Sequence, residues 1–213
     1  MEAKLKTAIV YDFDGTLARG NLQEQSFIPE IGMTRDEFWD EVKERTKDED
    51  ADEILVYMHL MLRKASDRGI TVTREQLLRH GRDALLFEGC EIIDEFEHVF
   101  ASKFIYHEDV AAWPGVAINY TTKTQFLFRI NKGIQNTWNN DDLNAYMPEE
   151  ERDVPFDRMI FLGDGDTDIP TMKMLTYQGG HSVAVYDPDR QDRDLKKIHR
   201  LLSDGRVDFV APA

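Results

Sequence analysis

Two short acidic clusters in this sequence each follow an apolar run. The first contains Asp12 and Asp14, and it comes directly after the apolar residues 8–11. The second, residues 163–168, contains three aspartates and comes directly after the apolar residues 159–162. Carboxylates at the ends of buried strands are typical of sites for hard divalent cations, which prefer oxygen ligands. Such a cation can in turn bind a phosphate, so the two clusters together predict metal-dependent phosphate chemistry.

The composition limits which partners the chain can have. The 213 residues include 41 acidic and 26 basic ones, and the formal net charge is −15. Nucleic acids and anionic bilayers attract clusters of Lys and Arg, so we expect neither a nucleic-acid partner nor a membrane partner. Because the overall charge repels anions, a local positive site such as a bound metal must attract any anionic substrate.

A single cysteine indicates the cellular compartment. Cys90 cannot form a disulfide within the chain, which is typical of proteins from a reducing compartment. The first residues are charged and lack the apolar core of a signal peptide, and no later apolar run is long enough to cross a bilayer. We therefore expect a cytoplasmic protein, whose oligomeric state the sequence does not define.

A helical block follows the first acidic cluster. Capping-box patterns begin helices at Thr34 and Thr73, each with a Glu or Gln three residues later. Between them, apolar residues recur at helical spacing over residues 54–65. Because this block follows an apolar strand at residues 5–11, we expect it to be inserted into a core that contains a sheet. The predicted insert spans residues 19–100, and the predicted core comprises residues 1–18 and 101–213.

Strands and helices alternate in the second half of the chain, which predicts an α/β fold with a parallel sheet. The expected strands are residues 104–106, 116–120, 159–162, 182–186 and 207–210, with turns at 107–109 and 113–115. The expected helices are residues 91–100, 123–131, 169–177 and 191–203, and residues 141–157 have the composition of a polar loop. The two acidic clusters would then lie at the carboxyl ends of parallel strands, where such sheets bind ligands.

Both clusters resemble motifs of one protein superfamily. Asp12-Phe-Asp-Gly-Thr, after an apolar strand, resembles motif I of the haloacid dehalogenase-like (HAD) superfamily, and the Gly-Asp-x-x-x-Asp pattern of residues 163–168 resembles its motif IV. Residues 113–133 are similar to a bacterial branch of HAD-like hydrolases. The resemblance implies a Rossmann-like parallel sheet with a helical cap of the C1 type. It also implies a Mg²⁺-dependent phosphatase that acts on a small phosphorylated metabolite.

The resemblance gives each motif aspartate a role. Asp12 is implied as the nucleophile that forms an aspartyl-phosphate, and Asp14 as the general acid and base. Mg²⁺ would be held by the side chain of Asp12, the backbone carbonyl of Asp14 and the carboxylate of Asp164. Asp168 is implied to lie next to the metal, either as a direct ligand or in contact with the residues that bind the metal. Asp166 lies between Asp164 and Asp168 in the sequence. An aspartate in this position is more often solvated than bound to a metal.

Further residues are implied in binding the phosphate. Gly15 permits the sharp turn that brings backbone N–H groups to the phosphate, and Thr16 can form a hydrogen bond across that turn. Lys123 matches the lysine that balances the charge of the transferred phosphoryl group. Lys132 is a rival for this role, because both lysines belong to the same stretch of sequence.

One part of the HAD pattern is not recognisable. Motif II is a Ser or Thr at the end of the strand that follows the insert, and it binds a phosphoryl oxygen. Only residues 90–100 are available for that strand and its helix, and they have the spacing of a helix. The sequence therefore lacks roughly one βα unit beside the strand that carries Asp12. Thr121, Thr122 and Ser102 are weak substitutes, because their segments belong elsewhere in the resembled fold.

The sequence thus supports two functions of different classes. The first is the phosphatase described above, with the helical insert as a cap that selects the substrate and excludes water. The second is a catalytically impaired relative that binds a metal or phosphate, or acts as an interaction module, because motif II is missing. Retention of the motif aspartates favours the enzyme, and the missing phosphate anchor favours the binding module. Neither pattern specifies the substrate.

Overall fold

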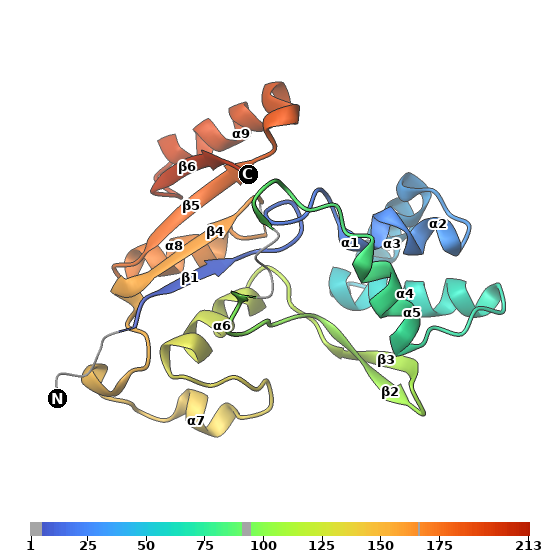
Figure 1. Ribbon diagram of the computed structural model, residues 1–213, viewed down its shortest axis with the longest axis horizontal. Coiled ribbons are helices and arrows are strands. Elements are labelled where there is room, and N and C mark those ends of the chain that lie inside the picture. The colour runs from blue at the N-terminus through green and yellow to red at the C-terminus, as the bar shows by residue number, and fades with distance from the viewer. Residues whose placement is uncertain (1–5, 91–94, 166) are drawn as a thin grey trace. The chain divides into compact units, whose positions relative to one another are not determined.

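The computed structural model describes residues 6–90, 95–165 and 167–213 (Figure 1). The chain divides into two compact units. The sheet unit comprises Met1–Leu17, Phe87–His98 and Tyr120–Ala213, and the helical unit comprises Ala18–Leu86 and Val99–Asn119. Asp166 and the first part of the helix expected at residues 91–100 lie outside the described residues. Among those that are described, no helix combines the length and the apolar content needed to cross a bilayer.

The sheet unit contains a parallel sheet of four strands in the order β1-β4-β5-β6. The strands are β1 (Ala8–Tyr11), β4 (Met159–Gly163), β5 (His181–Tyr186) and β6 (Phe209–Pro212). All three neighbouring pairs run parallel, with Val10 opposite Phe161 in the first of them. The predicted α/β class with a parallel sheet is confirmed. Within the described residues β1 pairs only with β4, so β1 is an edge strand of this sheet.

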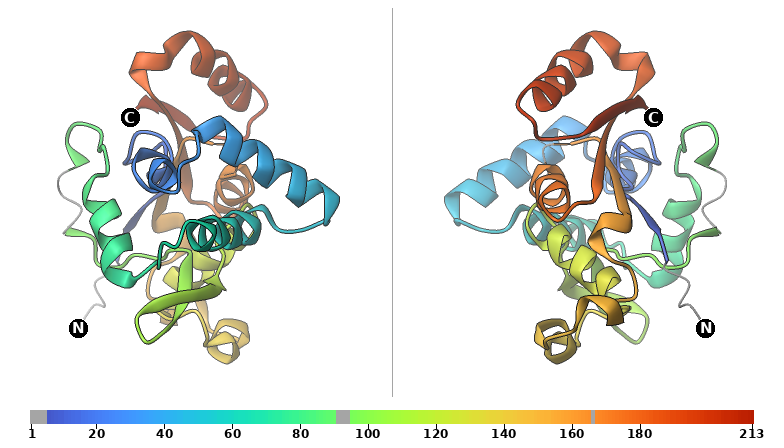
Figure 2. Two further views of the ribbon diagram at one scale, coloured as in Figure 1. Left: turned by 90° about the vertical axis from the view of Figure 1, so that its right-hand side faces the viewer. Right: turned by 90° about the vertical axis from the view of Figure 1, so that its left-hand side faces the viewer.

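Three helices of the sheet unit share one apolar core with the sheet (Figure 2). They are α6 (Thr122–Asn131), α8 (Ile169–Tyr177) and α9 (Gln191–Ser203). Leu127, Met172 and Leu201, one from each helix, belong to the same buried cluster as Phe161 and Ala184 of the sheet. Burial of these side chains is the main stabilising term for this unit. The helices predicted at 169–177 and 191–203 have the bounds that the periodicity indicated.

The polar stretch before β4 contains more structure than expected. It carries α7 (Asn140–Asn144) and the short 3₁₀ helices η2 (Glu149–Glu151) and η3 (Phe156–Arg158), and η4 (Pro188–Arg190) precedes α9. The side chain of Asn139 caps α7 by accepting a hydrogen bond from the backbone N–H of Asp142. The prediction of a loop without helices over residues 141–157 was therefore wrong, because short helices of this kind depend on local capping and lack a periodic apolar pattern.

The helical unit is built from five helices and a hairpin. The helices are α1 (Leu22–Gln25), α2 (Phe27–Glu30), α3 (Arg35–Asp48), α4 (Glu53–Asp67) and α5 (Arg74–Arg82), and the hairpin strands are β2 (Lys103–His107) and β3 (Val110–Val116). Both predicted capping boxes are present: Thr34 and Thr73 each accept a hydrogen bond from the backbone N–H three residues later and receive one back. The helix that begins after Thr73 ends at Arg82, earlier than the periodicity suggested.

The helical insert was predicted to end at residue 100, but the structure places the return to the sheet unit elsewhere. The hairpin belongs to the helical unit, because Ala111 is part of the apolar core of that unit and its N–H donates to the carbonyl of Val72 over 2.8 Å. Residues 87–98 instead belong to the sheet unit, where the ring of Phe96 contacts that of Tyr11 edge-on at 5.5 Å. Sequence spacing alone could not reveal these contacts between distant segments.

Three local predictions in this region were also wrong. Residues 113–115 lie within β3 instead of forming a turn, and the chain reverses at Glu108 and Asp109, which have φ angles of 47° and 68°. Residues 116–120 do not form a strand beyond Val116, and residues 96–100 are not helical. Pro114 is tolerated in β3 because a two-stranded hairpin leaves an outer edge on which no N–H needs a partner.

Candidate functional site

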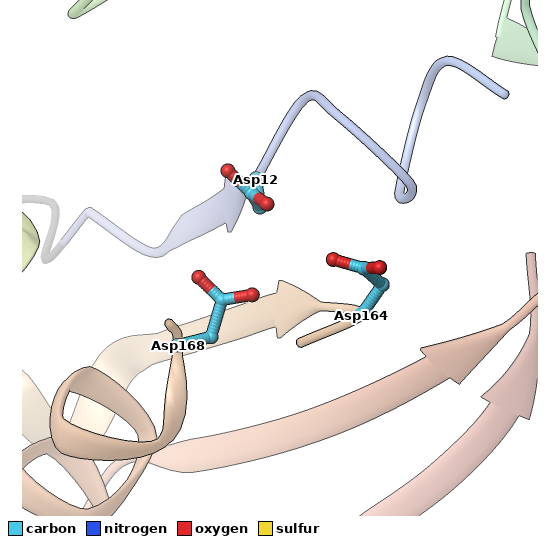
Figure 3. A group of neighbouring side chains, drawn as sticks. All are labelled: Asp12, Asp164 and Asp168. Atoms are coloured by element: carbon cyan, nitrogen blue, oxygen red, sulfur yellow. The ribbon is translucent and has the colours of Figure 1, made fainter. Parts of the chain in front are cut away.

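Three carboxylates gather at the carboxyl ends of β1 and β4 (Figure 3). Asp12 follows β1, and its N–H donates to the carbonyl of Leu162 over 2.8 Å, which extends the pairing of the two strands by one residue. Asp164 follows β4 directly, and Asp168 lies just before α8. Carboxylate oxygens of Asp12, Asp164 and Asp168 all lie within 4.8 Å of one another. The expectation that the two acidic clusters meet at one edge of a parallel sheet is confirmed.

Lys123 joins two of these carboxylates. Its Nζ lies 2.8 Å from Oδ1 of Asp12 and 2.6 Å from Oδ1 of Asp168. The side chain of Asp168 is fully buried, and those of Lys123 and Asp12 are 17% and 16% exposed. Lys132, the rival, lies near the other end of α6 and donates to backbone carbonyls that include those of Leu143 and Ala145. The structure therefore places Lys123, and not Lys132, at the carboxylates.

Burial and charge set the protonation of this cluster. Burial lowers the pKa of Lys123, but the negative charges of Asp12 and Asp168 and their hydrogen bonds outweigh it, so the pKa is raised above its usual value. For Asp168, burial and then the charge of Asp12 raise the pKa to about 6, against the opposing effect of Lys123 and a hydrogen bond from Gly165. Lys123 is thus charged at neutral pH, and Asp168 is ionised only at a cost in free energy.

The donor set fits a hard divalent cation. Three carboxylates and one ammonium group carry a formal charge of −2 when all are ionised, because three negative charges face one positive charge. The ligands on offer are oxygen atoms, as Mg²⁺ and Ca²⁺ require, and among the described residues this group includes no His or Cys, the ligands typical of zinc. A bound dication would balance the remaining charge and relieve the repulsion that raises the pKa of Asp168.

Two glycines permit the close approach of the chain to these carboxylates. Gly15 has a φ of +80°, and a Cβ at this position would lie 2.3 Å from Oδ2 of Asp164. A Cβ on Gly163 would lie 2.4 Å from Oδ2 of Asp168. The same oxygen of Asp168 accepts a hydrogen bond from the N–H of Gly165 at 3.2 Å. The sequence predicted the turn at Gly15. It did not predict that Gly163 must lack a side chain because the carboxylate of Asp168 occupies that volume.

The rest of the first motif forms a tight turn. The backbone N–H groups of Thr16 and Leu17 both donate to the carbonyl of Phe13, at 3.2 and 2.9 Å. The buried hydroxyl of Thr16 has no hydrogen-bond partner within the described part of the chain, so the predicted bond across the turn is made by its backbone and not by its side chain. Asp14 lies in the same turn, and its carboxylate is not among the three that gather.

The possible substitutes for motif II lie in different places. Ser102 is in the helical unit, where its hydroxyl accepts a hydrogen bond from the N–H of Ile118. Thr121 and Thr122 are the N-cap and the first residue of α6, directly before Lys123. Their position on a helix differs from that of a residue ending a strand, so neither reproduces the motif II arrangement. Within the described residues, the side of β1 on which that strand would pair is open.

A contact between helices that positions Lys123 was not foreseen. The hydroxyl groups of Thr124 on α6 and Thr171 on α8 lie 3.3 Å apart, and Thr171 is fully buried. This pair fixes the first turn of α6 against the helix that begins after Asp168. A threonine within a helix has no sequence signal that distinguishes such a contact from a solvated position.

Comparisons with known proteins give one partial similarity. No protein-family model matches the chain, and no solved structure matches it. A protein of Borreliella burgdorferi, described only as an uncharacterized protein, is 29% identical over 84 residues. The similar region covers 38% of this chain and 27% of the relative. The match therefore spans little more than a quarter of that protein, and its description names no activity.

Proposed function

We propose that this protein is a Mg²⁺-dependent phosphatase of the HAD type, which hydrolyses a small phosphorylated metabolite through an aspartyl-phosphate. The observation that carries the proposal is the convergence of Asp12, Asp164 and Asp168 around the ammonium group of Lys123. Asp12 begins a motif that resembles HAD motif I, and the other two aspartates belong to a segment that resembles motif IV. Four residues with the implied roles thus lie at one sheet edge, although they come from three segments that are distant in sequence.

The metal would be held by oxygen atoms of this cluster. The carboxylates of Asp12 and Asp164 and the backbone carbonyl of Asp14 are the proposed ligands, with Asp168 beside them. When bound, Mg²⁺ supplies the positive charge that lets a phosphate approach a carboxylate and stabilises charge on the transferred group. Few protein ligands are needed, because Mg²⁺ retains water and takes phosphate oxygens as further ligands.

Asp12 and Asp14 would carry out the two chemical steps. In the first, an oxygen of Asp12 attacks the phosphorus atom, the bond to the leaving oxygen breaks, and Asp14 donates a proton to that oxygen. In the second, a water molecule attacks the phosphorus atom, Asp14 accepts its proton, and the bond to Asp12 breaks to release phosphate. Asp14 is thereby returned to its protonated state, and the nucleophile is regenerated.

Lys123 and Thr16 would assist these steps. Lys123 already bonds to the nucleophile, so its charge lies where a phosphoryl group would be transferred. The buried hydroxyl of Thr16 is without a partner among the described residues, and it is therefore available to a ligand oxygen. The helical unit would act as the cap that selects the substrate, as the resemblance implies for an insert after the first strand.

Turnover of a generic aryl phosphate tests the proposal. We expect Mg²⁺-dependent hydrolysis that EDTA abolishes, and we expect Asp12→Asn to reduce the rate by at least about a thousandfold, because the amide cannot act as the nucleophile. The variant keeps the size of the side chain, so its fold can be compared by thermal unfolding. A wild-type protein as inactive as Asp12→Asn would refute the enzymatic proposal.

The close approach at Gly15 gives a second test. Gly15→Ala and Gly69→Ala both place a methyl group at a positive φ, +80° and +70°, and the backbone strain alone is expected to cost each about 1 kcal/mol of stability. Only at Gly15 does the new Cβ meet a carboxylate, that of Asp164, whereas nothing lies within 4 Å at Gly69. We expect urea unfolding to show Mg²⁺-dependent stabilisation in Gly69→Ala and not in Gly15→Ala. Equal Mg²⁺ stabilisation of both variants would contradict the assignment of Asp164 to the metal.

A second candidate function, binding of a metal and a phosphate without turnover, is favoured by the lack of a described strand on one side of β1. The strand that carries Asp12 has one described neighbour, and no Ser or Thr of a strand on its other side faces the nucleophile in the described part of the sheet. A protein that binds Mg²⁺ and a phosphate but does not turn over fits this feature. Beryllofluoride, which mimics a phosphoryl group on a carboxylate, distinguishes the two: stabilisation by Mg²⁺ and beryllofluoride without any turnover would favour the binding module.

A further inference from the structure

A surface of the sheet unit displays two aromatic side chains to solvent. Residues 133–151, which include α7 and η2, connect α6 to the last segment before β4 (Figure 1). Within them Trp138 is 77% exposed and Tyr146 is 90% exposed. Trp and Tyr are large side chains with a polar tip, and they are enriched at protein interfaces, so an exposed Trp and an exposed Tyr eight residues apart are candidate contacts for a partner. We call residues 133–151 the aromatic–acidic surface.

The same residues carry charge of one sign. Five of them are acidic, and none is Lys, Arg or His. The acidic residues are Asp141, Asp142, Glu149, Glu150 and Glu151, and all five are exposed. Two of them lie in the first turn of α7, three residues and four residues after Trp138, and the other three form η2, which begins three residues after Tyr146. Each aromatic ring therefore has carboxylates close to it in the chain.

A buried arginine holds the first part of this surface in place. Arg129 of α6 is fully buried and faces backbone carbonyls instead of a carboxylate. One of its terminal nitrogens donates to the carbonyls of Asn136 and Asn139, at 2.8 and 3.1 Å. The other donates to the carbonyl of Thr137 at 3.0 Å and to the side chain of Asn140 at 2.8 Å. These four bonds bracket Trp138 on both sides, so its backbone is fixed.

A lysine holds the second part. Lys132 donates from Nζ to the carbonyls of Asp142 and Leu143 in α7 and to that of Ala145, the C-cap of this helix. This contact fixes the end of α7 directly before Tyr146. Both basic residues thus direct their charged groups to backbone carbonyls, Arg129 from a fully buried position and Lys132 from a half-buried one. Even with these two positive charges counted against the five negative ones, the region remains negative.

From this combination we propose that the aromatic–acidic surface docks a Lys- and Arg-rich segment of another protein. Rigid aromatic side chains lose little conformational entropy on binding, and they are the residues that most often dominate protein interfaces. Guanidinium groups stack on the faces of Trp and Tyr rings and pair at the same time with carboxylates nearby. A basic segment is therefore the partner that satisfies both features of the surface. This inference does not depend on the proposed phosphatase activity.

Two other occupants fit less well. A nucleic acid is repelled by the five carboxylates. A second copy of the chain would bring an identical negative surface against this one, and like charges across an interface oppose association. Charge complementarity thus selects a basic partner.

Binding of fluorescein-labelled deca-arginine, followed by fluorescence anisotropy at low ionic strength, tests the proposal. Any protein with a charge of −15 attracts this peptide to some extent, so the aromatic residues provide the decisive comparison. Trp138→Ala/Tyr146→Ala leaves the charge unchanged, and we expect it to weaken binding about tenfold. The matched control is Trp113→Ala, which removes a 56% exposed aromatic ring from the hairpin of the helical unit and should change binding less than about twofold.

A second pair of variants tests the acidic residues. Glu149→Gln/Glu150→Gln should weaken binding more than Glu44→Gln/Asp48→Asn, which removes the same two charges from exposed positions on α3. Equal affinities of the wild type and the aromatic double variant would overturn the proposal, as would absence of binding to the wild type. Light scattering after size exclusion tests whether a second copy of the chain binds here instead. A wild type that is dimeric and a Trp138→Ala/Tyr146→Ala variant that is monomeric would show self-association through this surface and would overturn the proposal.

Discussion

Replacing Lys123 with methionine should destabilise the metal-free protein by about 3–5 kcal/mol, the effect expected when one partner of a buried charge pair is removed. The ammonium group bonds to Asp12 and Asp168, whose side chains are 16% and 0% exposed. Without it these carboxylates face each other and Asp164 with no cation beside them. Urea unfolding in EDTA at neutral pH measures the loss, and Mg²⁺ should restore part of it by supplying the missing positive charge.

Lys132→Met is the matched control for this experiment. Lys132 lies at the other end of the same helix, and its ammonium group faces the carbonyls at the end of α7 and not carboxylates. Its removal should destabilise the protein by about 1–2 kcal/mol, the size of a hydrogen-bond loss, with no change in the response to Mg²⁺. Similar losses for the two variants, or a Mg²⁺ response that Lys132→Met alone removes, would show that the charge balance at the carboxylates has been misassigned.

Asp168→Asn should have the opposite effect on the metal-free protein and stabilise it at neutral pH. The pKa of Asp168 is raised from 3.8 to about 6, with burial as the main cause and the charge of Asp12 as the second. An acid with a raised folded-state pKa binds more protons when folded, so stability falls as the pH rises from about 4 to about 6. The asparagine avoids this loss, and one pKa unit corresponds to about 1.4 kcal/mol, so the gain is at most about 3 kcal/mol.

The pH dependence separates this effect from ordinary changes in packing. In EDTA the advantage of Asp168→Asn should be absent near pH 4, grow up to about pH 6 and remain constant above it. Mg²⁺ at neutral pH should stabilise the wild type more than the variant, because the variant lacks one carboxylate near the metal. Asp157→Asn, at an exposed aspartate of the same unit, serves as the matched control. An advantage that is independent of pH would contradict the assigned cause.

The sequence predicted the part of the site that follows from strand ends. Asp12 comes directly after one apolar run, and Asp164 follows another after a single glycine. Parallel strands bring such positions to one edge whatever the connections between them. The helix that carries Lys123 was predicted too, since α6 covers the expected residues 123–131. Lys123 was the lysine predicted to meet the carboxylates, but Lys132 stayed a rival, because the choice depends on which end of α6 faces the sheet edge. A periodic pattern contains no such information.

Features that depend on contacts between distant segments were the ones missed. Trp113-Pro-Gly has the composition of a turn, but β3 runs through it because Ala111 is packed in the helical core and Ile105 pairs with Trp113. The buried Arg129 has no acidic partner nearby in sequence, and only the folded loop shows that it binds the carbonyls around Trp138. Local propensity is overridden where tertiary contacts supply more free energy than the local preference.

The most direct test of the central claim, that Asp12 is a nucleophile in metal-dependent phosphoryl transfer, is the mass of the acid-quenched protein after reaction with 4-nitrophenyl phosphate and Mg²⁺. The variant to use is Asp14→Asn. Nitrophenolate leaves without a proton, so the first step survives, whereas attack by water lacks its base and the aspartyl-phosphate accumulates. We predict a mass increase of one phosphoryl group in Asp14→Asn that requires Mg²⁺ and is absent from Asp12→Asn/Asp14→Asn. No increase in Asp14→Asn, or the same increase in the double variant, would contradict the account.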